Sequence, residues 1–236
     1  MIENHEIDPQ LMKKVKQLIN TYYEEKLKES FYQSEIAKRL DKQHNTSDID
    51  WESAFFVWHR PTSNINQIPN LSQGLCKTMD EYIAQLIKLA EKLSELMSEN
   101  LGLEKDYIKK SFSGSNGPAL GTKMAKYPQC PRPELVRGLR EHTDAGGDQV
   151  EVLSNGLYKS VVHRIMPDKN GSRISIATFY NPIRDAIISP APKLLYPSNF
   201  HFRDYLKLYG NTKFGEKGSR FESMKNVINS HKNILA

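Results

Sequence analysis

The sequence changes character near Phe112, and this change limits the folds that the chain can adopt. Before it, apolar residues recur three and four positions apart, which is the spacing of one face of an α-helix. After it, Gly and Pro become frequent, and short runs of β-branched and aromatic residues replace the helical pattern. The sequence therefore predicts an N-terminal helical flank followed by a β-rich core.

Two long helices are expected within the flank. The first follows Asp8, a suitable N-cap, has Pro9 at its first position and continues to Leu40. The second follows Pro69 and ends at Gly102, a residue type common at helix C-termini. Its apolar stripe comprises Leu75, Met79, Tyr82, Leu86, Leu89, Leu93 and Leu96. Because the stripe is single and short, it favours a helix packed on a sheet over a coiled coil.

Short β-rich runs predict the strands of the core. The expected strands span residues 50–58, 121–127, 158–166, 173–181 and 187–188, and a last helix spans residues 202–209. These elements divide the chain into a helical flank (residues 1–110), a β core (residues 111–200) and a C-terminal helix with a polar tail (residues 201–236).

Composition limits the classes of protein to which the chain can belong. It has 236 residues, of which 38% are hydrophobic, and its mean hydropathy is −0.61, so it suits one sizeable water-soluble domain. We find no long apolar run and no N-terminal secretory signal, and we expect no membrane span and a cytoplasmic location. The two cysteines, Cys76 and Cys130, do not suggest a disulfide framework, which fits a reducing compartment.

The distribution of charge argues against nucleic acid as a partner. The net charge is +5 and the isoelectric point is about 9.0, but Lys and Arg alternate with Glu and Asp along the chain. A nucleic-acid surface needs a basic block, usually with interleaved aromatic residues, and the sequence contains none. A preference for small anionic substrates is the milder inference.

Five residues carry the chemistry that the pattern predicts. If His142 and Asp144 lie in a strand, two positions apart, their side chains point the same way. With His163 from a β-branched run, they would form the two-histidine, one-carboxylate triad of non-haem Fe(II) oxygenases. Arg173 and Ser175 also share a strand face, and a guanidinium beside a hydroxyl can receive a carboxylate. The sequence thus predicts an oxygenase site beside an anion clamp.

A His-x-Asp pair by itself is a weak signal. On the alternative interpretation, His142 is a turn residue and His163 is a hydrogen-bonded histidine of the core. The residues around the triad favour the metal site. They form longer motifs, which are Asp50-Trp51-Glu52-Ser53, Glu99-Asn100-Leu101-Gly102-Leu103, Gly121-Thr122-Lys123, Tyr127-Pro128, Gly138-Leu139-Arg140, His142-Thr143-Asp144-Ala145-Gly146-Gly147, Asn155-Gly156, Tyr158-Lys159-Ser160-Val161, His163-Arg164, Phe179-Tyr180-Asn181-Pro182, Pro190-Ala191-Pro192, Tyr205-Leu206-Lys207-Leu208-Tyr209 and Arg220-Phe221-Glu222. In these motifs the chain resembles plant 1-aminocyclopropane-1-carboxylate oxidases, a family of the 2-oxoglutarate/Fe(II) dioxygenase superfamily.

The resemblance implies an α+β fold with a double-stranded β-helix (jelly-roll) core and an N-terminal helical flank. It implies that His142, Asp144 and His163 bind Fe(II). The other implied roles are carboxylate, ascorbate or bicarbonate binding by Arg173 and Ser175, pocket positions for Lys123 and Tyr127, a neighbouring charge from Arg140, and a C-terminal segment with Arg220 and Glu222 that folds over the site. On the alternative interpretation, Lys123 and Arg220 are surface charges, and Glu222 only pairs with Arg220.

The implied reaction oxidises 1-aminocyclopropane-1-carboxylate with O2 and ascorbate to ethylene, cyanide and CO2, with bicarbonate as activator. A facial triad suits it, because it leaves about three iron positions open, two for the amine and carboxylate of the substrate and one for O2. Two alternatives stay open from the sequence. One is an ordinary 2-oxoglutarate-dependent oxygenase of plant metabolism, and the other is a catalytically inactive, truncated relative.

The chain departs from the family pattern in two places. The family's N-terminal strand-helix-strand is absent before Asn4-His5-Glu6-Ile7. The second departure is internal, because Gly147 runs directly into Asp148, where the family has several jelly-roll strands. We therefore expect an incomplete core, with open sheet edges and exposed apolar side chains near the site.

Overall fold

The computed structural model describes residues 2–42, 46, 49–188, 191, 200–214 and 223. They form a mixture of helices and strands, in agreement with the expected α+β class. The chain divides into two compact units. Unit 1 contains Met1–Ala90, Gly121–Arg140 and Arg164–Thr178, and unit 2 contains Glu91–Leu120, Glu141–His163 and Phe179–Ala236.

The N-terminal helices of unit 1 begin as the sequence predicts. Helix α1 (Pro9–Tyr22) has Asp8 as its N-cap, whose carboxylate accepts a 2.8 Å hydrogen bond from the amide of Gln10. It buries Leu11, Val15, Ile19 and Tyr22. The predicted single helix to Leu40 is instead divided into the π-helical turn η1 (Tyr23–Leu27), α2 (Lys28–Tyr32) and α3 (Glu35–Asp41). Ser34 caps α3 with its side chain, and such a cap starts a new helix rather than continuing the old one.

A three-stranded sheet forms the centre of unit 1, with the order β1-β2-β5. Strand β1 spans Ser53–Arg60, β2 spans Ala119–Tyr127 and β5 spans Arg173–Asn181. The central strand β2 is buried along most of its length, as a strand with neighbours on both edges should be. Gly121 of β2 lies so close to the Phe56 ring of β1 that a Cβ would clash with it, so this position of β2 requires glycine.

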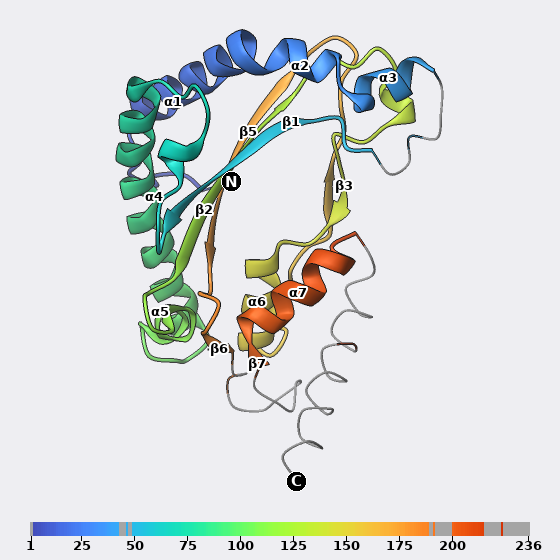
Figure 1. The fold of residues 1–236 in the computed structure, drawn as a ribbon. Coiled ribbons are helices and arrows are strands. Elements are labelled where there is room, and N and C mark those ends of the chain that lie inside the picture. The colour runs from blue at the N-terminus through green and yellow to red at the C-terminus, as the bar shows by residue number, and fades with distance from the viewer. Residues whose placement is uncertain are drawn as a thin grey trace. The chain divides into compact units, whose positions relative to one another are not determined.

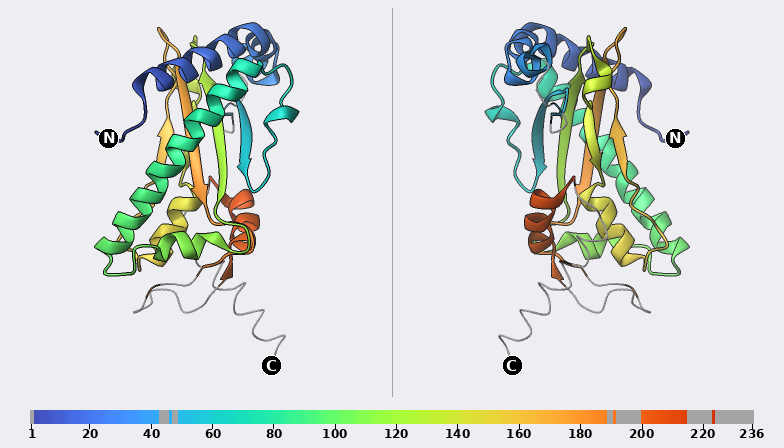
Figure 2. Two further views of the ribbon diagram at one scale, coloured as in Figure 1. Left: turned by 90° about the vertical axis from the view of Figure 1, so that its left-hand side faces the viewer. Right: turned by 90° about the vertical axis from the view of Figure 1, so that its right-hand side faces the viewer.

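Helix α4 (Gln73–Asn100) confirms the long helix of the flank, and Gly102 follows it with a φ of +71°. Figures 1 and 2 show α1 and the first part of α4 along one face of the β1-β2-β5 sheet. The predicted stripe is buried in this part of α4 but not at its end, where Leu96 is 48% exposed. There the helix buries Ser98 instead, whose hydroxyl donates to Ser94 and accepts from the amide of Ile108.

Unit 2 is built from short helices around one apolar cluster. Besides the last part of α4, the helices of its described residues are α5 (Tyr107–Ser113), α6 (Ala145–Leu153) and α7 (Phe202–Thr212). Strand β6 (Ile187–Ile188) pairs antiparallel with β7 (Phe200–His201). The buried cluster consists of Ile108, Phe112, Ala145, Val152, Leu153, Ile188, Phe202 and Tyr205. These residues come from all three helices and from β6, so they hold α6, which follows the candidate ligand Asp144, in place.

The remaining elements are the 3-10 turns η2 (Ile65–Gln67) and η3 (Pro133–Leu135) and the paired strands β3 (Leu139–His142) and β4 (His163–Ile165). The strand expected over residues 158–166 is therefore confirmed only at its end.

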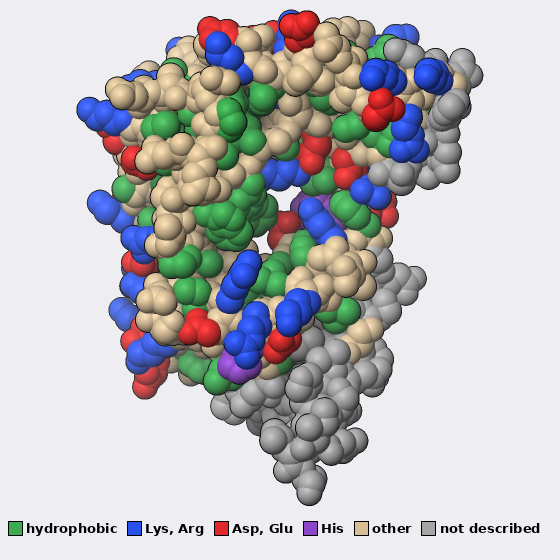
Figure 3. All heavy atoms as spheres, in the orientation of Figure 1, with side chains coloured by type: hydrophobic (Ala, Val, Ile, Leu, Met, Phe, Trp, Pro, Cys, Tyr) green, Lys and Arg blue, Asp and Glu red, His purple; other side chains and the backbone are tan. Residues whose placement is uncertain are grey.

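Among the described residues, no helix has both the length and the apolar character that a bilayer-crossing helix needs. On the face shown in Figure 3, the Lys and Arg side chains of the described residues are mixed with Asp and Glu side chains.

Candidate metal centre

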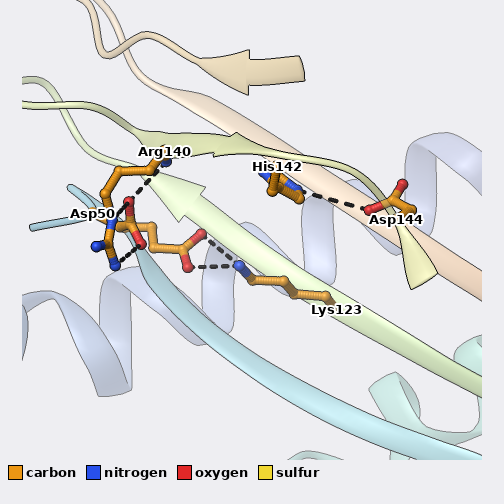
Figure 4. A network of polar contacts seen from close by, with 6 residues as sticks. Asp50, Lys123, Arg140, His142 and Asp144 are labelled. Carbon is orange, nitrogen blue, oxygen red and sulfur yellow. Dashed lines mark hydrogen bonds and ion pairs between the residues drawn. The ribbon is translucent and has the colours of Figure 1, made fainter. Parts of the chain in front are cut away.

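Three side chains of unit 2 converge as the sequence predicts. His142 ends β3, Asp144 immediately precedes α6, and His163 begins β4. Nε2 of His142 lies 3.7 Å from Oδ1 of Asp144, and Nε2 of His163 lies 3.9 Å from Oδ2 (Figure 4 draws the first pair). One potential ligand atom from each residue lies within 4.8 Å of the other two. Two imidazole nitrogens and one carboxylate oxygen are the donor set of non-haem Fe(II) sites, so these three side chains would hold such an ion.

The backbone places these side chains differently from the expected strand. Strand β3 ends at His142, and Asp144 occupies the N-cap position of α6, with φ −89° and ψ 133°. An N-cap aspartate usually accepts hydrogen bonds from the first turn of its helix, but Asp144 makes no such bond. Its carboxylate faces the two imidazoles instead, which is the arrangement that a metal ligand needs.

The two histidines differ in exposure and in hydrogen bonding. The His142 side chain is only 4% exposed, and its ring lies 4.3 Å from the His163 ring and 6.1 Å from the Phe214 ring. His163 is 44% exposed, and its Nδ1 lies 3.0 Å from the carbonyl oxygen of Val161. A carbonyl can only accept, so Nδ1 carries the proton, and Nε2 keeps the lone pair that a metal ion requires. The centre is thus anchored on one side and accessible on the other.

A buried polar network supports the turn that carries the triad. The hydroxyl of Thr143 donates to Oδ2 of Asp148 at 3.0 Å, and the hydroxyl of Tyr205 donates to the same oxygen. The hydroxyl of Tyr209 donates to the backbone carbonyl of Thr143. Asp148 is fully buried, so these bonds tie α7 to the segment between His142 and α6. This network was not predicted from the sequence, although its residues lie in or beside the motifs quoted above.

Three of the predicted pocket cations belong to unit 1, and two of them, Lys123 and Arg140, are paired with carboxylates. Nζ of Lys123 lies 2.6 Å and 2.8 Å from the two oxygens of Glu52. Arg140 binds Asp50 through Nε at 3.0 Å, through a terminal nitrogen at 3.2 Å and through its backbone amide at 2.8 Å. Figure 4 shows both pairs, with Glu52 as the unlabelled residue. Asp50 and Glu52 belong to one of the quoted motifs, but these ion pairs were not predicted from the sequence.

Tyr127 and Arg173, also of unit 1, lie together. Burial raises the pKa of the Tyr127 hydroxyl, and the neighbouring charge of Glu52 raises it further, so the group is a neutral hydrogen-bond donor. The guanidinium carbon of Arg173 lies 5.8 Å from the centre of the Tyr127 ring, within range of a cation–π interaction. Ser175 follows on the same face of β5, half-buried, as its spacing from Arg173 predicts. Arg220 and Glu222 lie outside the described residues.

Comparisons with known proteins show the family of the chain. The family model of the 2OG-Fe(II) oxygenase superfamily matches residues 146–182. The chain is 58% identical to 1-aminocyclopropane-1-carboxylate oxidase 1 of Arabidopsis thaliana, over 98% of this chain and 86% of that protein. It is 43% identical to 1-aminocyclopropane-1-carboxylate oxidase 1 of Malus domestica, over 94% of this chain and 85% of that protein. The chain belongs to the 1-aminocyclopropane-1-carboxylate oxidase family.

Solved structures agree with this membership. The structure of JOX2 in complex with 2OG, Fe and JA superposes with a TM-score of 0.77 and 26% identity, over 93% of this chain and 79% of that one. The rice dioxygenase for auxin oxidation has a TM-score of 0.66 at 17% identity and shows the shared fold alone, over 91% of this chain and 86% of that one. Family membership, the superfamily match and the converging donor set identify an Fe(II)-dependent oxidoreductase.

The alignment with the Arabidopsis oxidase also bears on the expected internal shortening. It is 267 positions long, which is 31 more than the 236 residues of this chain. At least that many positions of the relative therefore have no counterpart here, in agreement with a missing internal stretch. Around the segment between α6 and β4, the side chains of Leu157, Val161 and Val162 are 76%, 70% and 55% exposed, as expected for a family member with an incomplete core.

Proposed function

We propose that the chain catalyses the oxidation of 1-aminocyclopropane-1-carboxylate to ethylene, cyanide and CO2, with His142, Asp144 and His163 as its Fe(II) ligands. The observation that carries this proposal is the convergence, within 4.8 Å, of two imidazole nitrogens and the carboxylate of Asp144, which makes no capping hydrogen bond to α6. The overall reaction balances when the substrate and ascorbate each give up two hydrogens and O2 is reduced to two waters. Iron, when bound, supplies the redox chemistry that links these two oxidations to O2.

The protein contributes orientation and charge. The exposed carboxylate of Asp144 and imidazole of His163 leave one side of the centre open for the amine and carboxylate of the substrate. We assign to Arg173 and Ser175 the binding of the carboxylate-like cosubstrate, ascorbate or the activator bicarbonate, because a guanidinium fork with a neighbouring hydroxyl is suited to it. Lys123, Tyr127 and Arg140 would add charge and hydrogen bonds to the pocket, and the family resemblance assigns Arg220 and Glu222 to a segment that covers it.

The finer points of the fold belong to the same proposal. We infer that the sheets β1-β2-β5 and β3-β4 are what remains of a jelly roll after the internal shortening. The division into a flank (residues 1–110), a core (111–200) and a C-terminal part (201–236) stays a prediction. So do the cytoplasmic location and the lack of a nucleic-acid partner.

The decisive experiment measures ethylene by gas chromatography over the purified chain supplied with Fe(II), ascorbate, bicarbonate and 1-aminocyclopropane-1-carboxylate. We expect ethylene that depends on both iron and ascorbate and is absent with Asp144→Ala. An iron-dependent rise in the melting temperature, measured on the same preparation, reports metal binding separately. If iron binds but ethylene stays at the level of Asp144→Ala, the chain is a metal-binding but inactive relative, and the proposed activity is wrong.

A second candidate is a 2-oxoglutarate-dependent oxygenase, which the superfamily match and the JOX2 complex favour. It would use Arg173 and Ser175 to bind the distal carboxylate of 2-oxoglutarate. Succinate formation from 2-oxoglutarate, with no requirement for ascorbate as a stoichiometric reductant, would distinguish it from the first candidate.

A further inference from the structure

A hollow of about 680 Å³ lies in unit 1 between α1 and the ends of β2 and β5 that meet it. It is lined by Lys13, Lys16, Gln17, Asn20, Thr21, Lys126, Ser172, Arg173 and Ile174. The five residues from α1 are spaced three and four apart, so they share one face of the helix. The buried residues of α1, such as Val15 and Ile19, lie between them in the sequence and occupy the other face.

The lining of this hollow is strongly basic. Four of its nine residues are Lys or Arg, and none is acidic. Four of the others carry hydroxyl or amide groups that can donate hydrogen bonds, and none is aromatic. Such a set suits oxyanions, which accept several charge-assisted hydrogen bonds at once. It offers no surface on which a nucleobase could stack.

Lys126 distinguishes the hollow from an ordinary solvent-exposed helix face. Its side chain is only 10% exposed, whereas charged residues on such a face are surrounded by water. Its Nζ donates a 2.7 Å hydrogen bond to Oδ1 of Asn20 and lies 5.4 Å from the centre of the Tyr23 ring. Both partners are neutral, whereas a buried ammonium normally requires a close anion. The nearest carboxylate in an ion pair with it is Glu24, at 4.0 Å, and Glu24 also binds Lys28 at 2.7 Å.

The electrostatics around Lys126 agree with this geometry. Burial lowers the pKa of its ammonium group, and the positive charges of Lys28 and Lys16 lower it further. Glu24 acts in the opposite direction, but burial outweighs it. The charge of Lys126 is therefore poorly compensated by the protein alone, and an anion in the hollow would compensate it.

We propose that this hollow binds a small polyanion that carries two or more phosphate or carboxylate groups. One group bonds to the buried Nζ of Lys126, and the others are held by Lys13 and Lys16 at the open side. The site lies apart in sequence from the three metal ligands and does not depend on the proposed activity. Arg173 also lines it, and because that residue belongs to the proposed cosubstrate clamp, the test uses other positions.

The test measures binding to the full chain, without iron or ascorbate, by isothermal titration calorimetry at constant ionic strength. The probes are tripolyphosphate and citrate, with chloride as the reference anion. We expect saturable binding of one or both, and the preference between them identifies phosphate or carboxylate as the natural group. If neither probe binds more tightly than chloride, the proposal is wrong.

Matched charge reversals on α1 separate a defined site from general attraction. Lys16→Glu removes a lining residue, whereas Lys14→Glu makes the same change at an exposed position of α1 that does not line the hollow. We expect Lys16→Glu to weaken binding about tenfold or more, because it removes a charge-assisted hydrogen bond and adds repulsion. Lys14→Glu should change it by less than about twofold, since the charge there is solvated and screened.

Equal losses in the two variants would overturn the proposal, because they would show long-range attraction to a basic helix. Lys126→Gln provides the second measurement, made on protein whose circular dichroism matches that of the unchanged chain. It keeps a hydrogen-bond donor but removes the buried charge, and binding should fall by at least as much as with Lys16→Glu. Unchanged binding in a folded Lys126→Gln protein would also overturn the proposal.

Discussion

Two groups of charged residues, one in each compact unit, are arranged in opposite ways. In unit 2, the carboxylate of Asp144 caps no helix and faces two imidazoles at 3.7 Å and 3.9 Å, contacts that are too long for strong hydrogen bonds. In unit 1, Lys123 binds both oxygens of Glu52, and Arg140 binds both oxygens of Asp50. The first arrangement needs a cation to complete it, whereas the second is already complete.

This difference indicates where a cation and where an anion would bind with little loss of existing interactions. A metal ion at the triad replaces few existing interactions. An anion at Lys123 or Arg140, in contrast, must displace the carboxylate of Glu52 or Asp50. Each of these side chains belongs to the same unit and is only 16% exposed. Arg173 lies against the neutral Tyr127 ring instead, so of the three predicted pocket cations Lys123, Arg140 and Arg173 it is the one best suited to receive an external anion.

The largest expected effect tests the incomplete side of this comparison. Asp144→Ala should weaken Fe(II) binding by more than about 100-fold, since it removes a proposed ligand and even outer partners of metal ligands contribute about 10- to 100-fold. Anaerobic calorimetry or the iron-dependent shift in melting temperature measures it. Glu141→Ala, a neighbouring exposed acid, is the matched control. Similar losses in both variants would mean that general negative charge, not the triad, attracts the ion.

The next effect concerns the network that holds the triad segment. Tyr205→Phe removes the hydroxyl that donates to the fully buried Asp148, and it should lower the free energy of unfolding by about 2 kcal/mol. Urea titration followed by circular dichroism measures the loss. Tyr107→Phe in α5 removes a phenol hydroxyl that makes no hydrogen bond to a buried acid among the described residues, and it should cost much less. Equal effects would show that Asp148 does not depend on Tyr205.

A smaller effect tests the complete network of unit 1. Glu52→Gln keeps a polar side chain beside Lys123 but removes its negative charge, so Lys123 should become available to an external anion. We expect the KM for ascorbate to fall by about threefold, which corresponds to less than 1 kcal/mol, with little change in kcat. Steady-state ethylene formation measures both constants. An increase in KM would instead mean that the pair positions Lys123 for its role.

The same comparison explains how far the sequence could predict the structure. The bounds of β5 and nearly all of β2 were predicted from the short β-rich runs, and α4 was predicted from its stripe. Helix α6 was not predicted, because Ala145-Gly146-Gly147 has no helical pattern. The helix also runs through the junction of Gly147 and Asp148, which further strands separate in the family. Its start fits because Gly146 packs against the Asn181 side chain, where a Cβ would clash.

The candidate site was predictable only where its residues are neighbours in sequence or share a motif. His142 and Asp144 are two apart, so their proximity hardly depends on the fold. Glu52 and Lys123 are 71 positions apart, and Asp50 and Arg140 are 90 apart. No local pattern reports such pairs, and the tertiary fold alone decides whether a basic side chain is available to a ligand or already neutralised.

The smallest expected effect is a pH dependence that originates in unit 1. Burial lowers the pKa of His59 below its ordinary value of 6.5, against a weaker opposing effect of Asp80, and Nε2 of His59 lies 2.9 Å from the hydroxyl of Thr122. Because the folded-state pKa is the lower one, the unfolded chain takes up the proton first as the pH falls. Stability should therefore decline as the pH drops below about 6.5, by at most about 1.4 kcal/mol per pH unit until the folded pKa is reached. His59→Gln, compared with the unchanged metal-free chain in urea titrations between about pH 7 and pH 5, should reduce this slope. If the free energy of unfolding fell equally steeply with pH in both proteins, protonation of His59 would cost nothing in the folded state. The interior of unit 1 would then accept an additional positive charge, contrary to the comparison drawn above.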